Sequence, residues 1–507
     1  MIDRRSFERR WGLRLRNRLL AASALVMLPA MPLAHADAVD DRRIEANVMA
    51  GAGDCAGAYP LFLSVADETG HARDHLSAAT CATTLGQTED AIAAYYRALA
   101  KREDLSRDEQ IYALKALAFE VEKTGRHAEA ADAFQQLVAL EDNAENRAYL
   151  AQASQRAGRT GDEINALEAA VAADPANRAN MLNLAYAYRR AGREDDAADM
   201  FARAAALDPA DTSALEDHAY ALRAAGRNAE SAAKFREAID ALRTKGASDD
   251  ASAGRLFRMR REVETLERDW STVAFLSYRS PFGGATSPLP EAGRSVSQFG
   301  AEAAWRPPGI GFDAGRIFEV YGRVFGSMEE DSLSPDEDTL QAGFGIRYKP
   351  FADHDLRLSL ERLVAIGDDA RDGWLVRAGY FWGDGVDFEP VKDDWNFTAL
   401  SIDAAHIIDD PEYTSLYAEF VQGHRFKLGE ASAINPHIVI AGQWQDDQFG
   451  STSRLEGGAG VTVSFWHDED AYTAPRGRID LTVEARFGIA GDSDDDSALL
   501  ARLVFFN

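Results

Sequence analysis

Four glycines recur at intervals of 33, 34 and 34 residues in the first half of the chain. They are Gly125, Gly158, Gly192 and Gly226. The pair Asp174-Pro175 likewise returns 34 residues later as Asp208-Pro209. A fixed period of this length predicts a stack of helical hairpins, because one hairpin cannot bury its apolar face without a neighbour.

The segment around Gly192 gives the expected anatomy of one repeat. Apolar residues fall on one face of each of two expected helices, at Leu184 and Tyr188 in the first and at Ala197, Phe201 and Ala204 in the second. Gly192 separates the helices, since glycine readily adopts the left-handed conformation that ends a helix. The pattern is that of tetratricopeptide (TPR) repeats, and about five copies are expected over roughly 72–243. We assign 72–265 to the repeats and 37–71 to a cap or an irregular first repeat.

The N-terminus has the features of an export signal over residues 1–36. Arginines precede a short apolar stretch at 19–33, and Ala34-His35-Ala36 resembles a cleavage site. Export leads to an oxidising compartment, which would allow Cys55 and Cys81, the two cysteines of the chain, to form a disulfide. The formal net charge of −28 argues against binding nucleic acid, which would need a basic face.

From residue 266 onward the apolar pattern changes from helical spacing to strict alternation. In 478–487, for example, Ile479, Leu481 and Val483 alternate with Asp480, Thr482 and Glu484. Alternating strands of about ten residues are typical of a transmembrane β-barrel, whose outer face meets lipid. About twelve antiparallel strands are expected, at roughly 271–279, 298–306, 315–327, 339–349, 354–366, 373–382, 395–408, 413–426, 435–446, 453–467, 477–489 and 497–506. A soluble barrel or sandwich with one solvated face is the alternative.

Side chains alternate between the two faces of a strand, and this alternation (strand parity) assigns a set of charged residues to the polar face. In a membrane barrel these side chains would line the lumen: Glu319, Arg323, Arg347, Lys349, Arg357, Glu361, Asp480, Glu484 and Arg486. One hypothesis is that they form a hydrated path for a glycan. The alternative is a network of salt bridges that rigidifies a closed barrel.

Several motifs of the second half stand out, among them Gln341-Ala342-Gly343-Phe344-Gly345, Trp382-Gly383-Asp384-Gly385 and Leu455-Glu456-Gly457-Gly458. Together they resemble the C-terminal domain of the phage-adsorption outer-membrane protein NfrA family. The resemblance covers roughly 266–507. It implies repeats in the periplasm, a barrel in the outer membrane, and a role in phage adsorption and in exporting an exopolysaccharide made by an inner-membrane glycosyltransferase.

The sequence therefore predicts an N-terminal TPR solenoid followed by an outer-membrane barrel that acts as a polysaccharide secretion pore. The expected partners are the polysaccharide and an inner-membrane glycosyltransferase complex or other envelope proteins docked on the repeats. Two alternatives remain open: a surface receptor with a closed barrel, and a scaffold that recruits envelope proteins. We expect no enzymatic activity, cofactor or metal, because no catalytic or metal-ligating motif stands out.

Overall fold

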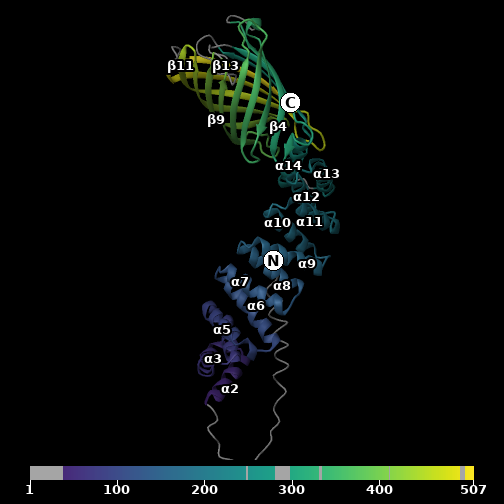
Figure 1. Cartoon of the computed structure of the whole chain (residues 1–507), viewed down its shortest axis with the longest axis vertical. Coiled ribbons are helices and arrows are strands. Elements are labelled where there is room, and N and C mark those ends of the chain that lie inside the picture. Colours follow the sequence, from purple (N-terminus) through teal and green to yellow (C-terminus); the bar gives the residue numbers. More distant parts are fainter. Residues whose placement is uncertain (1–37, 247–248, 280–296, 330–333, 410, 492–496) are drawn as a thin grey trace, which may run out of the picture. The chain divides into compact units, whose positions relative to one another are not determined.

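A computed structural model of the protein describes residues 38–246, 249–279, 297–329, 334–409, 411–491 and 497–507. The predicted export signal, 1–36, lies outside the described residues. The chain forms two compact units, which divide between Gly158 and Arg159. Helices precede strands along the chain (Figure 1), and the change falls between Glu267 and Trp270.

Helices occupy the first half of the chain, as the glycine period predicts. Those of the first unit are α2 (Ala38–Gly51), α3 (Cys55–Thr69), α4 (Ala72–Leu85), α5 (Thr88–Ala100), α6 (Arg107–Lys123), α7 (His127–Leu140) and α8 (Ala144–Arg156). Those of the second unit are α9 (Thr160–Ala173), α10 (Arg178–Arg190), α11 (Glu194–Leu207), α12 (Thr212–Ala224), α13 (Asn228–Thr244) and α14 (Asp250–Glu267). The segment predicted to be a cap therefore holds two helices, α2 and α3.

The recurring glycines stand where the helices end. Gly125, Gly158, Gly192 and Gly226 all have positive φ, between 70° and 78°. A residue with a β-carbon is strained in that conformation, which explains the glycine at each turn. No helix in the described part of the chain has the length and apolarity needed to cross a bilayer.

Alanine and phenylalanine form the core of the repeats. Ala197, Phe201 and Ala204 are fully buried, as the repeat pattern predicts. The ring of Phe201 meets Tyr186 edge to face with 5.1 Å between the ring centroids. The alanines allow neighbouring helices to approach closely, and the aromatic rings fill the space between them.

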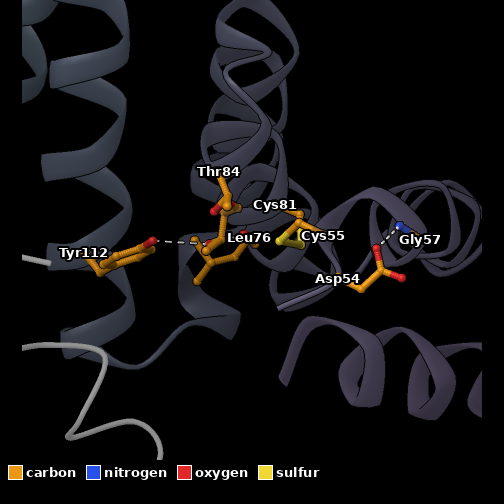
Figure 2. Close-up of a disulfide and its surroundings, with 8 residues drawn as sticks. Asp54, Cys55, Gly57, Leu76, Cys81, Thr84 and Tyr112 are labelled. Atoms are coloured by element: carbon orange, nitrogen blue, oxygen red, sulfur yellow. Dashed lines mark hydrogen bonds between the residues drawn. A yellow bond between two sulfur atoms is a disulfide. The ribbon is translucent and has the colours of Figure 1, made fainter. Parts of the chain in front are cut away.

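A disulfide joins Cys55, the first residue of α3, to Cys81 in α4 (Figure 2). The Cα atoms of the two cysteines are 5.0 Å apart, within the usual range for this bond. Just before α3, the Asp54 carboxylate accepts a hydrogen bond from the backbone amide of Gly57 and caps the helix. The disulfide therefore fixes α3, whose first turn is capped by Asp54, against α4.

Strands occupy the second half in one antiparallel sheet. They are β1 (Trp270–Arg279), β2 (Gln298–Trp305), β3 (Phe312–Asp313), β4 (Arg316–Ser327), β5 (Gln341–Lys349), β6 (Asp355–Ala365), β7 (Gly373–Asp384), β8 (Asp394–Ile407), β9 (Tyr413–Gly429), β10 (Ser432–Asp447), β11 (Gly450–His467), β12 (Gly477–Gly491) and β13 (Ser497–Phe506). Each predicted strand has its counterpart. The two-residue β3, which pairs only with β4, was not predicted.

The sheet closes on itself into a barrel of twelve strands. Strand β2 pairs with both β1 and β4, and β1 pairs with β13, so no long edge is left open. Because the number of strands is even, the chain enters and leaves the barrel at the same end. There Thr272 of β1 and the last residue, Asn507, exchange two backbone hydrogen bonds.

Within the second unit, the last helices contact the turns at this end of the barrel. Arg260 of α14 donates to the carbonyl oxygen of Thr473 at 2.7 Å, and the Tyr472 hydroxyl donates to Asp240 of α13 at 3.0 Å. In the same turn, the backbone amides of Tyr472 and Thr473 donate to Asp470 and hold its pKa below the ordinary value. These contacts join the repeats to the β11–β12 turn.

Candidate functional site

The barrel carries its charges inside and its large apolar side chains outside. In β4, Glu319 and Arg323 are 3% and 6% exposed, whereas Val320 and Val324 are 41% and 42% exposed. Proteins surrounded by water show the opposite arrangement, since charged residues are almost never fully buried there. An apolar outer band around a polar interior is the pattern of a barrel that meets lipid.

All nine residues predicted for the polar face have inward parity in their strands, but they fall into separate groups. Four of them belong to an ion-paired group on β2 and β4–β6, which we call the Glu361 cluster. Its members are Glu302, Arg306, Glu319, Arg323, Arg347 and Glu361. Two others, Glu484 and Arg486, belong to a second group on β1 and β9–β13, the Glu484 cluster. Its members are Arg279, Glu419, His437, Glu456, Glu484, Arg486 and Arg502.

The Glu361 cluster is built around a carboxylate that is 1% exposed. Arg323 Nε donates to Glu361 at 2.6 Å, and the Tyr321 hydroxyl donates to the same carboxylate at 2.9 Å. Arg347 donates to Glu302 at 2.7 Å, and its guanidinium lies 4.4 Å from the ring centroid of Tyr321. Each buried charge therefore has a partner of opposite sign, which offsets the cost of removing it from water.

The Glu484 cluster is organised around Glu484 and Arg486, which are also 1% exposed. Arg486 donates to Glu484 and to Glu419, each at 2.7 Å. Arg502 Nη2 and His437 Nε2 both lie 3.0 Å from Glu484. Glu484 and Arg486 are closed off from solvent, which shows that side chains fill the lumen around them.

The remaining three predicted residues do not join either cluster. Lys349 donates to the backbone carbonyl oxygens of Gly315 and Ala352 and holds two turns at the end of the barrel. Arg357 pairs with Asp355 at 2.8 Å, and Asp480 pairs with Arg478 at 2.9 Å. Lys349 and Asp480 thus have local roles here, whereas Arg357 also borders the cavity described next.

A cavity of about 290 Å³ lies inside the barrel beside the Glu361 cluster. Arginine side chains from four consecutive strands line it: Arg323, Arg347, Arg357 and Arg377. Two carboxylates, Glu302 and Asp403, also line it, together with the rings of Phe275 and Phe325. Its volume is near the lower end of small-molecule binding pockets, at ~300 Å³.

Glycines on neighbouring strands make room for the buried charges. A β-carbon at Gly343 would lie 1.8 Å from an oxygen of Glu361. One at Gly460 would lie 2.4 Å from Cγ of Glu484. No side chain fits at such distances, so each glycine is required by the close approach of a glutamate side chain from the adjacent strand.

Ion pairs between described interior side chains stay within one part of the wall. They join strands of the Glu361 cluster or strands of the Glu484 cluster, or they join Arg377 of β7 to Asp403 of β8. No ion pair among the described residues links the two clusters across the lumen. The two charged walls therefore face one another without being tied together by such pairs.

Sequence reasoning missed several members of the site. Glu302, Glu419, Glu456 and Arg502 have the same inward parity as the predicted residues. Applying the parity rule to every strand would have found them, since each lies in an alternating segment. The cavity itself depends on the register between strands, which parity does not give.

The family described as "Bacteriophage N adsorption protein A C-term" (NfrA_C) matches residues 333–503. This segment is therefore similar to the NfrA C-terminal family. The match begins in the connection before β5, so β1, β2 and β4 lie outside it although they complete the ring. It covers less than half of the chain. A transmembrane barrel of the outer membrane fits this family.

Solved structures similar to the helical part are those of TPR proteins. "Crystal structure of MamA protein" is 20% identical, covers 35% of this chain and 95% of that chain, and has a TM-score of 0.30. "Crystal structure of YrrB: a TPR protein with an unusual peptide-binding site" is 18% identical, with 37% and 98% covered and a TM-score of 0.29. The C-terminal part of a TPR repeat-containing protein from Cytophaga hutchinsonii is 15% identical, with 45% and 89% covered and a TM-score of 0.34. No curated protein matches the chain.

Proposed function

We propose that this protein exports an exopolysaccharide across the outer membrane. In this proposal the barrel spans the outer membrane and the repeats lie in the periplasm. The repeats dock an inner-membrane glycosyltransferase complex or other envelope proteins, and the barrel carries the polymer outward. The glycosyltransferase as partner and the polymer as cargo come from the resemblance to the NfrA family.

The observation that carries the proposal is the charged lumen inside an apolar shell. A band of exposed apolar side chains, such as Phe344 at 62% and Ile438 at 55%, would be costly in water but is favourable in lipid. Two walls of charge, which no ion pair among the described residues links across the lumen, support a hydrated passage for a polar polymer. The cavity beside the Glu361 cluster supports contact with a sugar-sized group.

The test is to delete the gene and measure the polysaccharide secreted by the host. We expect secretion to fall to background and to return when the full-length protein is supplied again. A second complementation with Arg347→Glu, which places a third carboxylate beside Glu302 and Glu319, should restore less secretion than wild type at equal protein level. Arg316→Glu, at the exposed start of β4, is the matched control and should restore it fully. Unchanged secretion after deletion would contradict the proposal.

A surface receptor with a closed barrel is the second candidate. It is favoured by the burial of Glu484 and Arg486, where side chains fill the lumen and ion pairs and hydrogen bonds brace the six strands β1 and β9–β13. Single-channel recording of the purified full chain in planar bilayers separates the two. Stable conductance that is altered by Arg347→Glu supports export, whereas insertion without conductance, together with unchanged secretion in the deletion strain, supports the receptor.

A further inference from the structure

The cavity beside the Glu361 cluster is lined by more cationic than anionic side chains, although Arg323 and Arg357 pair with Glu361 and Asp355, which do not line it. Four guanidinium groups line it, against the two carboxylates of Glu302 and Asp403. Arg347 pairs with Glu302 at 2.7 Å, and Arg377 pairs with Asp403 at 2.7 Å. The carboxylates that line the cavity are therefore already engaged by two of its four arginines.

Arg323 is the residue that points to a ligand. Its side chain is only 5% exposed, and its Nε donates to Glu361. Its Nη2 is buried and has no hydrogen-bond partner among the described residues. A buried charged donor without an acceptor is unfavourable, and native structures usually supply the missing partner as water, an ion or a bound group.

Arg357 provides a second cation that differs in character. It lines the same cavity, its side chain is 42% exposed, and it pairs with Asp355 near the start of β6. Parity places it two inward positions from Glu361 along that strand. A group that enters the cavity thus meets a buried guanidinium and a more accessible one.

We propose that this cavity binds the anionic group of an acidic sugar, with a carboxylate as the preferred group. Guanidinium groups bind carboxylates through paired, charge-assisted hydrogen bonds, and Arg323 has an unused donor for this purpose. The Phe275 ring that borders the cavity offers apolar surface to the C–H face of a sugar ring, whereas Phe325 is 4% exposed and its ring centroid lies 4.6 Å from the guanidinium of Arg323. The ligand is therefore a uronic-acid unit of a glycan, and this inference rests on the proposed export of a polysaccharide.

The experiment measures binding to purified full-length protein in detergent micelles by calorimetry. The three probes are an oligogalacturonide, a neutral oligosaccharide of the same length, and a sugar phosphate. We expect the oligogalacturonide to bind more tightly than either of the others. Arg323→Gln should raise its Kd about tenfold or more, because a charged hydrogen bond is lost. Arg316→Gln, at an exposed arginine that begins β4 and pairs with Asp313 outside the cavity, should change it less than about twofold.

Arg357→Gln provides a second variant in case Arg323→Gln does not fold, because Arg357 is more exposed. It should also raise the Kd of the oligogalacturonide. Binding that is insensitive to both variants overturns the proposal, as does equal binding of the neutral oligosaccharide. Tighter binding of the sugar phosphate overturns the choice of a carboxylate. If the protein does not export a polysaccharide, secretion is unchanged in the deletion strain. That result is distinct from the binding experiment and does not contradict a measured oligogalacturonide site.

Discussion

The repeats and the barrel solve the same problem, filling an interior, with opposite residues. The repeats bury alanine and phenylalanine, such as Ala204 and Phe201, and leave most of their charged side chains at the surface, with Glu120 and Glu163 among the buried exceptions. The barrel buries Glu361, Glu484 and Arg486 and leaves phenylalanine and isoleucine outside. The difference shows that burial alone does not define a hydrophobic core, because the medium around each part decides which side chains face outward.

The two interiors should also respond differently to damage. When a buried side chain of an apolar core is truncated, the free energy of unfolding falls in proportion to the atoms removed and the cavity left behind. A charged interior depends on the pairing of each group, so removing one partner leaves the others buried without compensation. The tryptophans after Trp11 all lie between Trp270 and Trp466. Tryptophan fluorescence therefore follows the barrel while circular dichroism at 222 nm follows the helices.

The largest effect is expected from Glu484→Ala. The change leaves Arg486, Arg502 and His437 without the carboxylate they share. We expect the free energy of unfolding of the barrel to fall by about 3–5 kcal/mol. Urea unfolding of the full chain in micelles, followed by tryptophan fluorescence, measures this.

Glu237→Ala is the matched control in the repeats. Glu237 pairs with Lys234 at 2.8 Å, but its side chain is 52% exposed, so the loss should be below about 1 kcal/mol. If Glu484→Ala costs as little as Glu237→Ala, the interior charges are solvated and the contrast between the two interiors fails.

The next largest effect tests the outer face. Phe344→Arg places a charge on the apolar band of β5, where the side chain is 62% exposed. In lipid this should cost about 2–4 kcal/mol near the middle of the bilayer. Leu207→Arg in α11, at 49% exposed, should stay within about 0.5 kcal/mol because that surface meets water. Folding yields in lipid vesicles compare the two, and equal yields would mean that the barrel is not surrounded by lipid.

Removal of the disulfide tests whether the helices can be destabilised without a change in the stability of the barrel. Replacing both cysteines, Cys55→Ser with Cys81→Ser, releases a crosslink across 26 positions. We expect the helical transition to lose about 2–3 kcal/mol, since the unfolded chain gains freedom. The fluorescence transition of the barrel should not move. A shift in both transitions would show that the helices and the barrel unfold together.

The helices and strands of both halves could be predicted from the sequence because each depends on a local pattern of residues. The glycine period placed the helix ends because a positive φ excludes most other residues there. Alternation placed the strands because one face had to be apolar throughout. The two-residue β3 escaped prediction, since two residues carry no period.

The pairing inside the barrel could not be predicted in this way. Arg347 lies directly opposite Glu319, and Gly345 lies opposite Glu361, only because β4, β5 and β6 adopt one particular register. A shift by two residues would keep every parity and separate each pair. The same register brings four arginines to one cavity, which is why the Nη2 of Arg323, without a hydrogen-bond partner among the described residues, could be found only in the structure.

The smallest effect concerns His218, a buried residue of α12 that is 7% exposed. Burial lowers its pKa below the ordinary value of 6.5, and the nearby Lys234 and Arg227 lower it further, against weaker opposition from Glu237 and Glu230. Below pH 6.5 the unfolded chain binds a proton that the folded repeats take up less readily. The stability of the helices should therefore decline as the pH falls through this range, by less than any of the effects above.

His218→Gln should remove part of this decline, measured as the pH dependence of the helical urea midpoint. His75 in α4, whose pKa burial also lowers, should supply a remaining part, and the double variant His75→Gln with His218→Gln should flatten the curve further. The barrel transition, followed by fluorescence in the same samples, is the internal control. An unchanged pH dependence in the double variant would mean that the apolar repeats do not hold these histidines neutral.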